Sequence, residues 1–186
     1  PRLARLRASH AGLISGPGPG PADPPEVQAL DRHVQLALEA LRQALDQAGM
    51  AGAPLGARCG VVLGTCSGGM LSIERHYEAL ARGEDPLDEA LLFNKRYYTG
   101  AGVLAWAAGA SGPTLSVVTA CAAGSGAIAQ GADLIRSGQC DVALVGGADA
   151  FSPSTLVGFD ALKATCEGMC APFSTPVGLN LGGGAA

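Results

Sequence analysis

The chain is poor in aromatic residues, and this shortage constrains its core. Aromatic side chains make up 4% of the 186 residues, whereas glycine alone contributes 28. The core should therefore rest on close contacts between small side chains, as in tightly stacked helices and strands. With 48% hydrophobic residues, the chain is long enough for one compact domain and short for two.

Charge is scarce as well, and basic charge most of all. Charged residues make up 15% of the chain, the formal net charge is −4, and no basic stripe follows the first ten positions. A surface that binds nucleic acid needs clustered Lys and Arg, so we do not expect nucleic acid as a partner. The most apolar stretch, residues 101–110, is too short to cross a bilayer and predicts a buried helix instead of a membrane span.

The chain contains six cysteines but no hydrophobic segment typical of a secretory signal. This combination favours reduced thiols and a cytoplasmic location over a disulfide framework. No C-x-x-C pair occurs, and neither Cys166 with Cys170 nor Cys59 with Cys66 has a nearby histidine to complete a zinc site. We therefore expect neither a metal nor another cofactor.

The first 25 residues differ from the rest in composition. An Arg-rich, acid-poor start runs into alternating glycine and proline at 16–25, which prevents helix formation and strand pairing. We expect residues 1–25 to form a flexible segment and residues 26–186 to form a single domain. Because the chain begins with proline and not methionine, we favour a cut piece over a targeting peptide.

Hydrophobic spacing predicts alternating helices and strands over the rest of the chain. Apolar residues three or four apart between Val27 and Ala48 predict one helix over 26–48. Further helices are expected over 70–81, 98–108 and 121–138, and strands over 58–65, 114–119 and 141–147. The last two strands and the helix between them form a βαβ unit with a right-handed crossover. Such alternation predicts a layered α/β fold.

Cys121 is the candidate nucleophile. It follows a predicted strand and opens a predicted helix, so the free N–H groups of the first helical turn would favour its thiolate. Its neighbours are small, which lets a thioester approach main-chain N–H groups that could stabilise an oxyanion. Position alone does not decide its role, because a free cysteine is more often buried and inert.

A resemblance to a known family gives Cys121 its role. Residues 114–150, TLSVVTACAAGSGAIAQGADLIRSGQCDVALVGGADA, resemble the active-site block of β-ketoacyl-acyl-carrier-protein synthases of the thiolase-like superfamily. The similarity continues through 151–164 and into 170–186, which resembles the R-P-F-[DS] and G-x-x-x-G-E-G-A stretches of that family. GVVLGT at 60–65 also fits, whereas 71–110 matches mainly in layout.

The resemblance implies both an activity and a fold. Cys121 would accept an acyl group from an acyl carrier protein, and a carbanion from decarboxylating malonyl carrier protein would attack the resulting thioester. This acyltransferase reaction is a Claisen condensation of fatty-acid or polyketide biosynthesis. The implied fold is thiolase-like, a mostly parallel sheet with helices on both faces that forms the amino-terminal half of a layered αβαβα subunit. The family also implies a homodimer.

The chain departs from the family pattern at several positions. Ala171 stands where the family usually has Arg, Pro176 and Val177 disturb the usual basic residue, and Gly183 replaces a common Glu. The family's first strand also has no counterpart at the start of the chain. The domain is therefore expected to be truncated at both ends.

Several of the family's catalytic groups have no counterpart either. The two catalytic histidines, a lysine and a Gly-Phe-Gly loop are missing, while His10, His33 and His76 all precede Cys121. Isolated imidazoles are more often structural than catalytic, and we interpret His33 and His76 as residues on helix surfaces. We expect this chain alone to be inactive in condensation.

Cys66 is the rival nucleophile. Residues 64–68 have the G-x-C-x-G form of a nucleophile elbow, as in an α/β-hydrolase that uses cysteine. Such an enzyme needs an acid and then a histidine downstream, and only His76 follows, in the same helical region. The glycines at 64, 68 and 69 match no phosphate-binding motif. A third hypothesis is a non-enzymatic fragment, because each thiolase-like half buries a face against the other.

Overall fold

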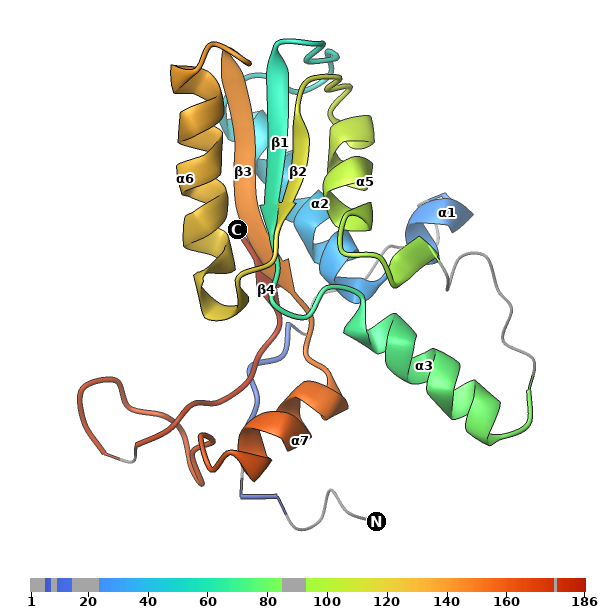
Figure 1. Cartoon of the computed structure of the whole chain (residues 1–186), viewed down its shortest axis with the longest axis vertical. Coiled ribbons are helices and arrows are strands. Elements are labelled where there is room, and N and C mark those ends of the chain that lie inside the picture. The colour runs from blue at the N-terminus through green and yellow to red at the C-terminus, as the bar shows by residue number, and fades with distance from the viewer. Residues whose placement is uncertain (1–5, 8–9, 15–23, 85–92, 176) are drawn as a thin grey trace.

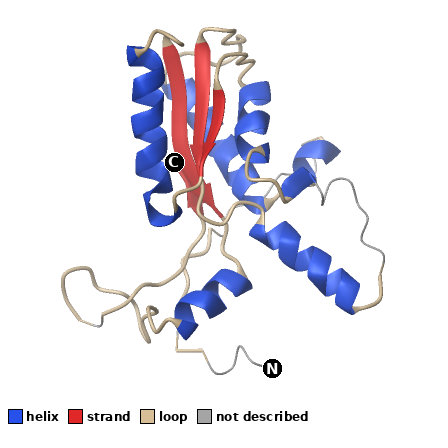
Figure 2. Ribbon diagram, in the orientation of Figure 1, coloured by secondary structure: helices blue, strands red, loops and turns tan. Residues whose placement is uncertain are grey.

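The computed structural model describes residues 6–7, 10–14, 24–84, 93–175 and 177–186, and the expected Gly-Pro linker lies largely outside these ranges. A four-stranded sheet with the order β2-β1-β3-β4 forms the centre of the molecule (Figure 2). Its strands are β1 (Cys59–Gly64), β2 (Thr114–Val117), β3 (Val142–Asp149) and β4 (Gly184–Ala185). The first three strands are parallel, and β4 runs antiparallel to β3.

Helices cover both faces of this sheet (Figure 1). One face carries α6 (Ala123–Arg136), which packs on β1 and β3, and the other carries α2 (Arg32–Gln47) and α5 (Thr99–Ala107). The remaining elements are α1 (Pro25–Gln28), α3 (Met70–Ala81), the short 3-10 helix η2 (Ala120–Ala122) and α7 (Pro153–Ala161). The α/β fold with a mostly parallel sheet and helices on both faces is confirmed.

β1 is the centre of the core, and all six of its residues are buried. Successive side chains of a strand point to opposite faces, so Val61 and Leu63 pack towards α2 and α5 while Val62 packs towards α6. Their partners include small residues such as Ala101 and Ala127. The expectation that small side chains make the core is therefore confirmed.

The prediction of one continuous helix over 26–48 is wrong at residue 31. The chain forms α1 and then α2, and Asp31 between them has an extended backbone with φ −60° and ψ 147°. Its carboxylate accepts hydrogen bonds from the His33 amide at 3.2 Å and from the Ser72 amide and hydroxyl at 3.0 and 2.7 Å. The Asp31 side chain caps α2, a position with a non-helical backbone, and also binds Ser72 of α3. These contacts break the helix, although the apolar spacing continues across residue 31.

The interpretation of His33 as a surface residue is also wrong. Its side chain is fully buried, and its Nδ1 atom lies 2.9 Å from Oδ1 of Asp31. Its Nε2 atom has no hydrogen-bond partner in the described part of the chain and lies close to Gly100 of α5. His33 is therefore a buried structural residue of α2 that faces α5 and is linked to α3 through Asp31. His76 is half-buried on α3.

Segments from the two ends of the chain lie side by side. The Gly12 amide donates to the Leu181 carbonyl at 2.7 Å, and the Gly183 amide donates to the Gly12 carbonyl at 3.0 Å. Arg7 forms an exposed ion pair with Glu167 at 3.3 Å. Among the helices of the described ranges, none is both long enough and apolar enough to cross a membrane.

Candidate functional site

The carboxyl ends of the three parallel strands meet at one edge of the sheet. Gly64 of β1 is paired with Val117 of β2 on one side and with Gly147 of β3 on the other. α3 and α7, which follow β1 and β3, lie beyond this edge (Figure 1). In open α/β sheets, ligands commonly bind outside the carboxyl ends of the strands. Cys121 lies in the connection that leaves β2 at this edge.

Cys121 is exposed and sits in η2, immediately before α6. The sequence predicted that it follows a strand directly, but β2 ends at Val117 and three residues intervene. One of them, Ala120, has φ +49°, a left-handed conformation that costs a non-glycine residue about 1–2 kcal/mol. The bend at Ala120 turns the chain from the strand into the helix, with Cys121 at the corner.

Of the main-chain N–H groups next to this thiol, the one without a backbone acceptor in the described ranges is that of Cys121 itself. The Ala122 amide donates to the Thr119 carbonyl at 3.1 Å, and the Ala123 amide donates to the Ala120 carbonyl. In the described ranges, the Cys121 amide donates to no backbone carbonyl, and no side chain caps the start of α6. An N–H group left open at such a position can bind the oxygen of an attacked carbonyl.

Glycine at position 64 permits close packing of β1 against the start of α6. A Cβ atom there would overlap the backbone carbonyl of Ala123, the first residue of α6.

We expect Gly64→Ala to lower the free energy of unfolding by about 1–3 kcal/mol, because the strand end and α6 must separate. Guanidinium unfolding of the 186-residue chain measures this change. Gly102→Ala is the control, since a Cβ there meets nothing within 4 Å and should stabilise α5 by up to about 1 kcal/mol. Equal stability of the two variants would contradict this packing.

Cys66, the rival nucleophile, lies near Cys121 but in a different environment. It is half-buried, and burial, followed by the negative charges of Asp149 and Cys121, raises the pKa of its thiol. A raised pKa means less thiolate at neutral pH. The one described ring contact of His76 is with Tyr77, and its Nδ1 has no partner among the described residues. Within the described ranges no histidine forms a hydrogen bond with Cys66, so the hydrolase hypothesis lacks the histidine base that it requires.

Asp149 is a residue of this site that the sequence reasoning missed. It ends β3, and its carboxylate accepts hydrogen bonds from Thr65, Cys66 and Ser67 in the turn after β1. The available signal was an acidic residue at the end of an otherwise apolar strand. Its donors, however, lie 82–84 residues away in the sequence.

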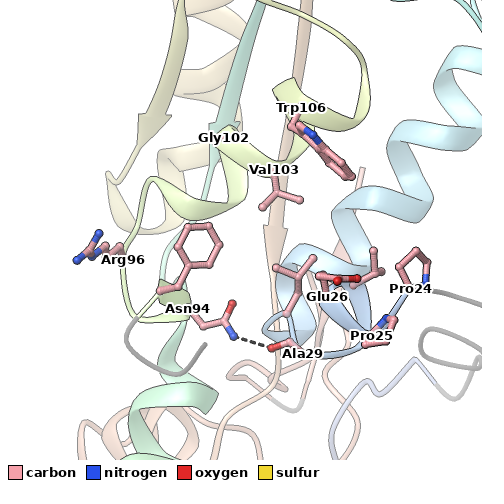
Figure 3. A pocket seen from close by; sticks show the side chains of 12 residues that line it. Pro24, Pro25, Glu26, Ala29, Asn94, Arg96, Gly102, Val103 and Trp106 are labelled. Atoms are coloured by element: carbon pink, nitrogen blue, oxygen red, sulfur yellow. Dashed lines mark hydrogen bonds between the residues drawn. The ribbon is translucent and has the colours of Figure 1, made fainter. Parts of the chain in front are cut away.

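A large apolar groove lies elsewhere (Figure 3). It measures about 1200 Å³ between α1 and α5, where Phe93, Val103 and Trp106 supply much of its apolar lining. The Asn94 side chain donates to the Ala29 carbonyl at 2.7 Å and ties its two sides together. The lining includes neither Cys121 nor the turn after β1, so we do not place the acyl chemistry there.

The other four cysteines form no second reactive or metal-binding site in the described structure. Cys59, Cys140 and Cys166 are buried, Cys170 is half-buried, and all carry free thiols. Across the described ranges, no three His, Cys, Asp or Glu side chains are grouped so that they could hold a metal ion.

A mostly parallel sheet between two helix layers, with an exposed cysteine where β2 passes into α6, defines a thiolase-like α/β domain. The chain belongs to the β-ketoacyl synthase family, since the family model described as "Beta-ketoacyl synthase, N-terminal domain" matches residues 20–186. It is similar to the crystal structure of a β-ketoacyl synthase from Burkholderia phymatum, with a TM-score of 0.87 and 27% identity over 97% of this chain and 47% of that one.

Relatives from polyketide pathways are also similar. The ketoacyl synthase alpha subunit of the tetracenomycin polyketide synthase from Streptomyces glaucescens is 36% identical over 76% of this chain and 35% of its own length. The structure of the ishigamide ketosynthase/chain length factor matches with a TM-score of 0.78 and 31% identity, over 88% of this chain and 41% of that one. The chain thus spans less than half the length of these relatives.

Proposed function

We propose that this chain supplies the amino-terminal domain of a β-ketoacyl-acyl-carrier-protein synthase and that Cys121 is its acyl-accepting nucleophile. The observation that carries the proposal is the exposed Cys121 thiol at the corner between β2 and α6, beside an amide without a backbone acceptor in the described ranges. The names of the relatives favour polyketide assembly over fatty-acid assembly. The free thiols agree with a cytoplasmic location.

The proposed chemistry has two steps. In the first, the Cys121 thiolate attacks the thioester carbonyl of an acyl carrier protein, the acyl group moves to sulfur and the carrier thiol leaves. In the second, malonyl carrier protein loses carbon dioxide, and the resulting carbanion attacks the acyl carbon on Cys121, which forms a carbon–carbon bond and releases the thiolate. The Cys121 amide would stabilise the oxyanion in both steps.

A second half of the enzyme is needed for the second step. By resemblance, two histidines, a lysine and a further oxyanion loop would come from that half. The outer face of α6 supports such pairing, since Ile128 is 60% exposed and Ile135 is 45% exposed. Apolar side chains gathered on one helix face are typical of a surface that another element covers. We expect the chain alone to bind acyl substrates poorly and to catalyse no condensation. We expect the intact synthase to act as a dimer.

Mass spectrometry tests which cysteine is acylated. The intact synthase is incubated with an acyl-pantetheine thioester, digested under non-reducing conditions, and each of the six cysteine-containing sites is mapped. We expect a single acyl group on Cys121 in the wild type, and the same adduct in Cys66→Ala. Acylation of Cys66 in place of Cys121, or no selective acylation, would rule out the proposed nucleophile.

A further inference from the structure

The side chain of Asp149, at the end of β3, accepts several hydrogen bonds from one other segment of the chain. Its Oδ1 atom accepts from the Thr65 hydroxyl at 2.9 Å and from the Ser67 amide and hydroxyl, both at 2.8 Å. The Cys66 amide donates to the same carboxylate, 2.9 Å from Oδ2 and 3.1 Å from Oδ1. A carboxylate accepts such bonds more strongly than a neutral group does. One side chain of β3 therefore holds three consecutive residues of another segment.

These residues belong to the turn of residues 65–69, which connects β1 to α3. The turn also closes on itself, because the Gly68 amide donates to the Thr65 hydroxyl at 2.9 Å. Gly68 has φ +52°, and a Cβ atom at Gly69 would overlap the backbone oxygen of Asn94. The turn thus packs against the segment before α5 and is hydrogen-bonded to Asp149. Its conformation depends on the charged acceptor, since two neighbouring amides point at one carboxylate.

The turn of residues 65–69 lies beside the segment that carries Cys121. The pairing of β1 with β2 continues past Gly64, because the Thr65 amide donates to the Val117 carbonyl at 3.0 Å. The end of β1 also packs directly on the first residue of α6, as the close approach of Gly64 to Ala123 requires. A group bound on Cys121 would therefore have this turn as a neighbour.

We propose that Asp149 is a positioning residue of the synthase, whose carboxylate holds the turn of residues 65–69 against Cys121 and so shapes the space for the acyl group. This inference rests on the proposed function of Cys121. Asp149 acts through Cys66 and Ser67 and does not itself touch the reacting atoms. An acyl donor must fit between the turn and the thiol, whereas a small alkylating reagent needs access to the thiol alone.

The test compares two probes on the intact synthase. For Asp149→Asn, we expect the rate of Cys121 acylation by an acyl-pantetheine thioester to fall about 10- to 100-fold, because displacement of a site wall by about 1 Å has an effect of that size. The asparagine NH₂ group cannot accept the hydrogen bond that the Cys66 amide now donates to Oδ2 of Asp149. Alkylation of Cys121 by iodoacetamide should change less than about twofold. Asp141→Asn is the matched control, since Asp141 pairs with Arg58 at the opposite end of β3, and it should change neither rate.

Each outcome separates this inference from the proposed function. If the wild type is not acylated on Cys121, the proposed function fails. If the wild type is acylated there and Asp149→Asn acylates at the wild-type rate, only the role of Asp149 fails. A parallel loss with both probes would mean general disruption and would also overturn it. If Asp149→Asn does not fold, Ser67→Ala replaces it, since it removes one bond to the carboxylate and should slow acylation about 3- to 5-fold. Unchanged acylation in Ser67→Ala would overturn the inference.

Discussion

Cys121→Ala should reduce β-ketoacyl formation by the intact synthase about 10⁴-fold or more, because no covalent acyl intermediate can form without the thiol. The fold should survive, since Cys121 is exposed and lies in a short 3-10 turn that alanine also accommodates. Product formation from acyl and malonyl carrier protein measures the first expectation. Circular dichroism and a thermal melt measure the second.

Cys66→Ala is the matched control for this experiment. It removes a thiol of the same size from the neighbouring turn, and the half-buried side chain makes no hydrogen bond that is described. The raised pKa of the Cys66 thiol argues against a nucleophilic role, so activity should stay within about threefold of the wild type. Wild-type activity in Cys121→Ala, or a large loss confined to Cys66→Ala, would reverse the assignment of the two cysteines.

Local sequence patterns predicted the elements well where one face of an element is apolar. The helix expected over 70–81 is observed as Met70–Ala81, and the strand expected over 58–65 is observed as Cys59–Gly64. A continuous apolar run bounded by glycine is a strong local signal for a buried strand. The same kind of pattern places Cys121 between a strand and a helix, but its role as nucleophile rests on the family resemblance and stays a prediction.

Long-range polar contacts could not be predicted in this way. Asp31 looked like an ordinary residue of a helix, because its partner Ser72 is 41 residues away. The burial of His33 was missed although its partner Asp31 is two residues away, because the break before α2 that brings the two side chains together was not predicted. The role of Asp149 stayed hidden because its donors come from the turn after another strand. In each case a charged or polar group is at least partly buried because the fold supplies its partner. Apolar periodicity contains no information about such partners.

The second large effect that we expect is a loss of stability when Asp31 is replaced. Asp31→Ala should lower the free energy of unfolding of the 186-residue chain by about 3–5 kcal/mol, as removal of one partner from a buried polar pair does. The loss has three parts. The cap of α2 disappears, Ser72 at the start of α3 loses its acceptor, and the buried His33 ring loses its only described partner. Guanidinium unfolding measures the change, with the exposed Asp46→Asn as a control that should have no measurable effect.

The pH dependence of stability distinguishes the charge of Asp31 from its shape. Burial by itself would raise the pKa of this carboxyl, but hydrogen bonds from His33 and Ser72 outweigh it and hold the pKa below its ordinary value. Its stabilising contribution is therefore complete above the unfolded-state pKa of about 3.9 and is lost as pH falls through the lower folded value. Asp31→Asn, which keeps the shape, should be less stable than the wild type at neutral pH, and the difference should shrink below about pH 4. A difference that stays constant from pH 7 to pH 2 would show that Asp31 acts without its charge.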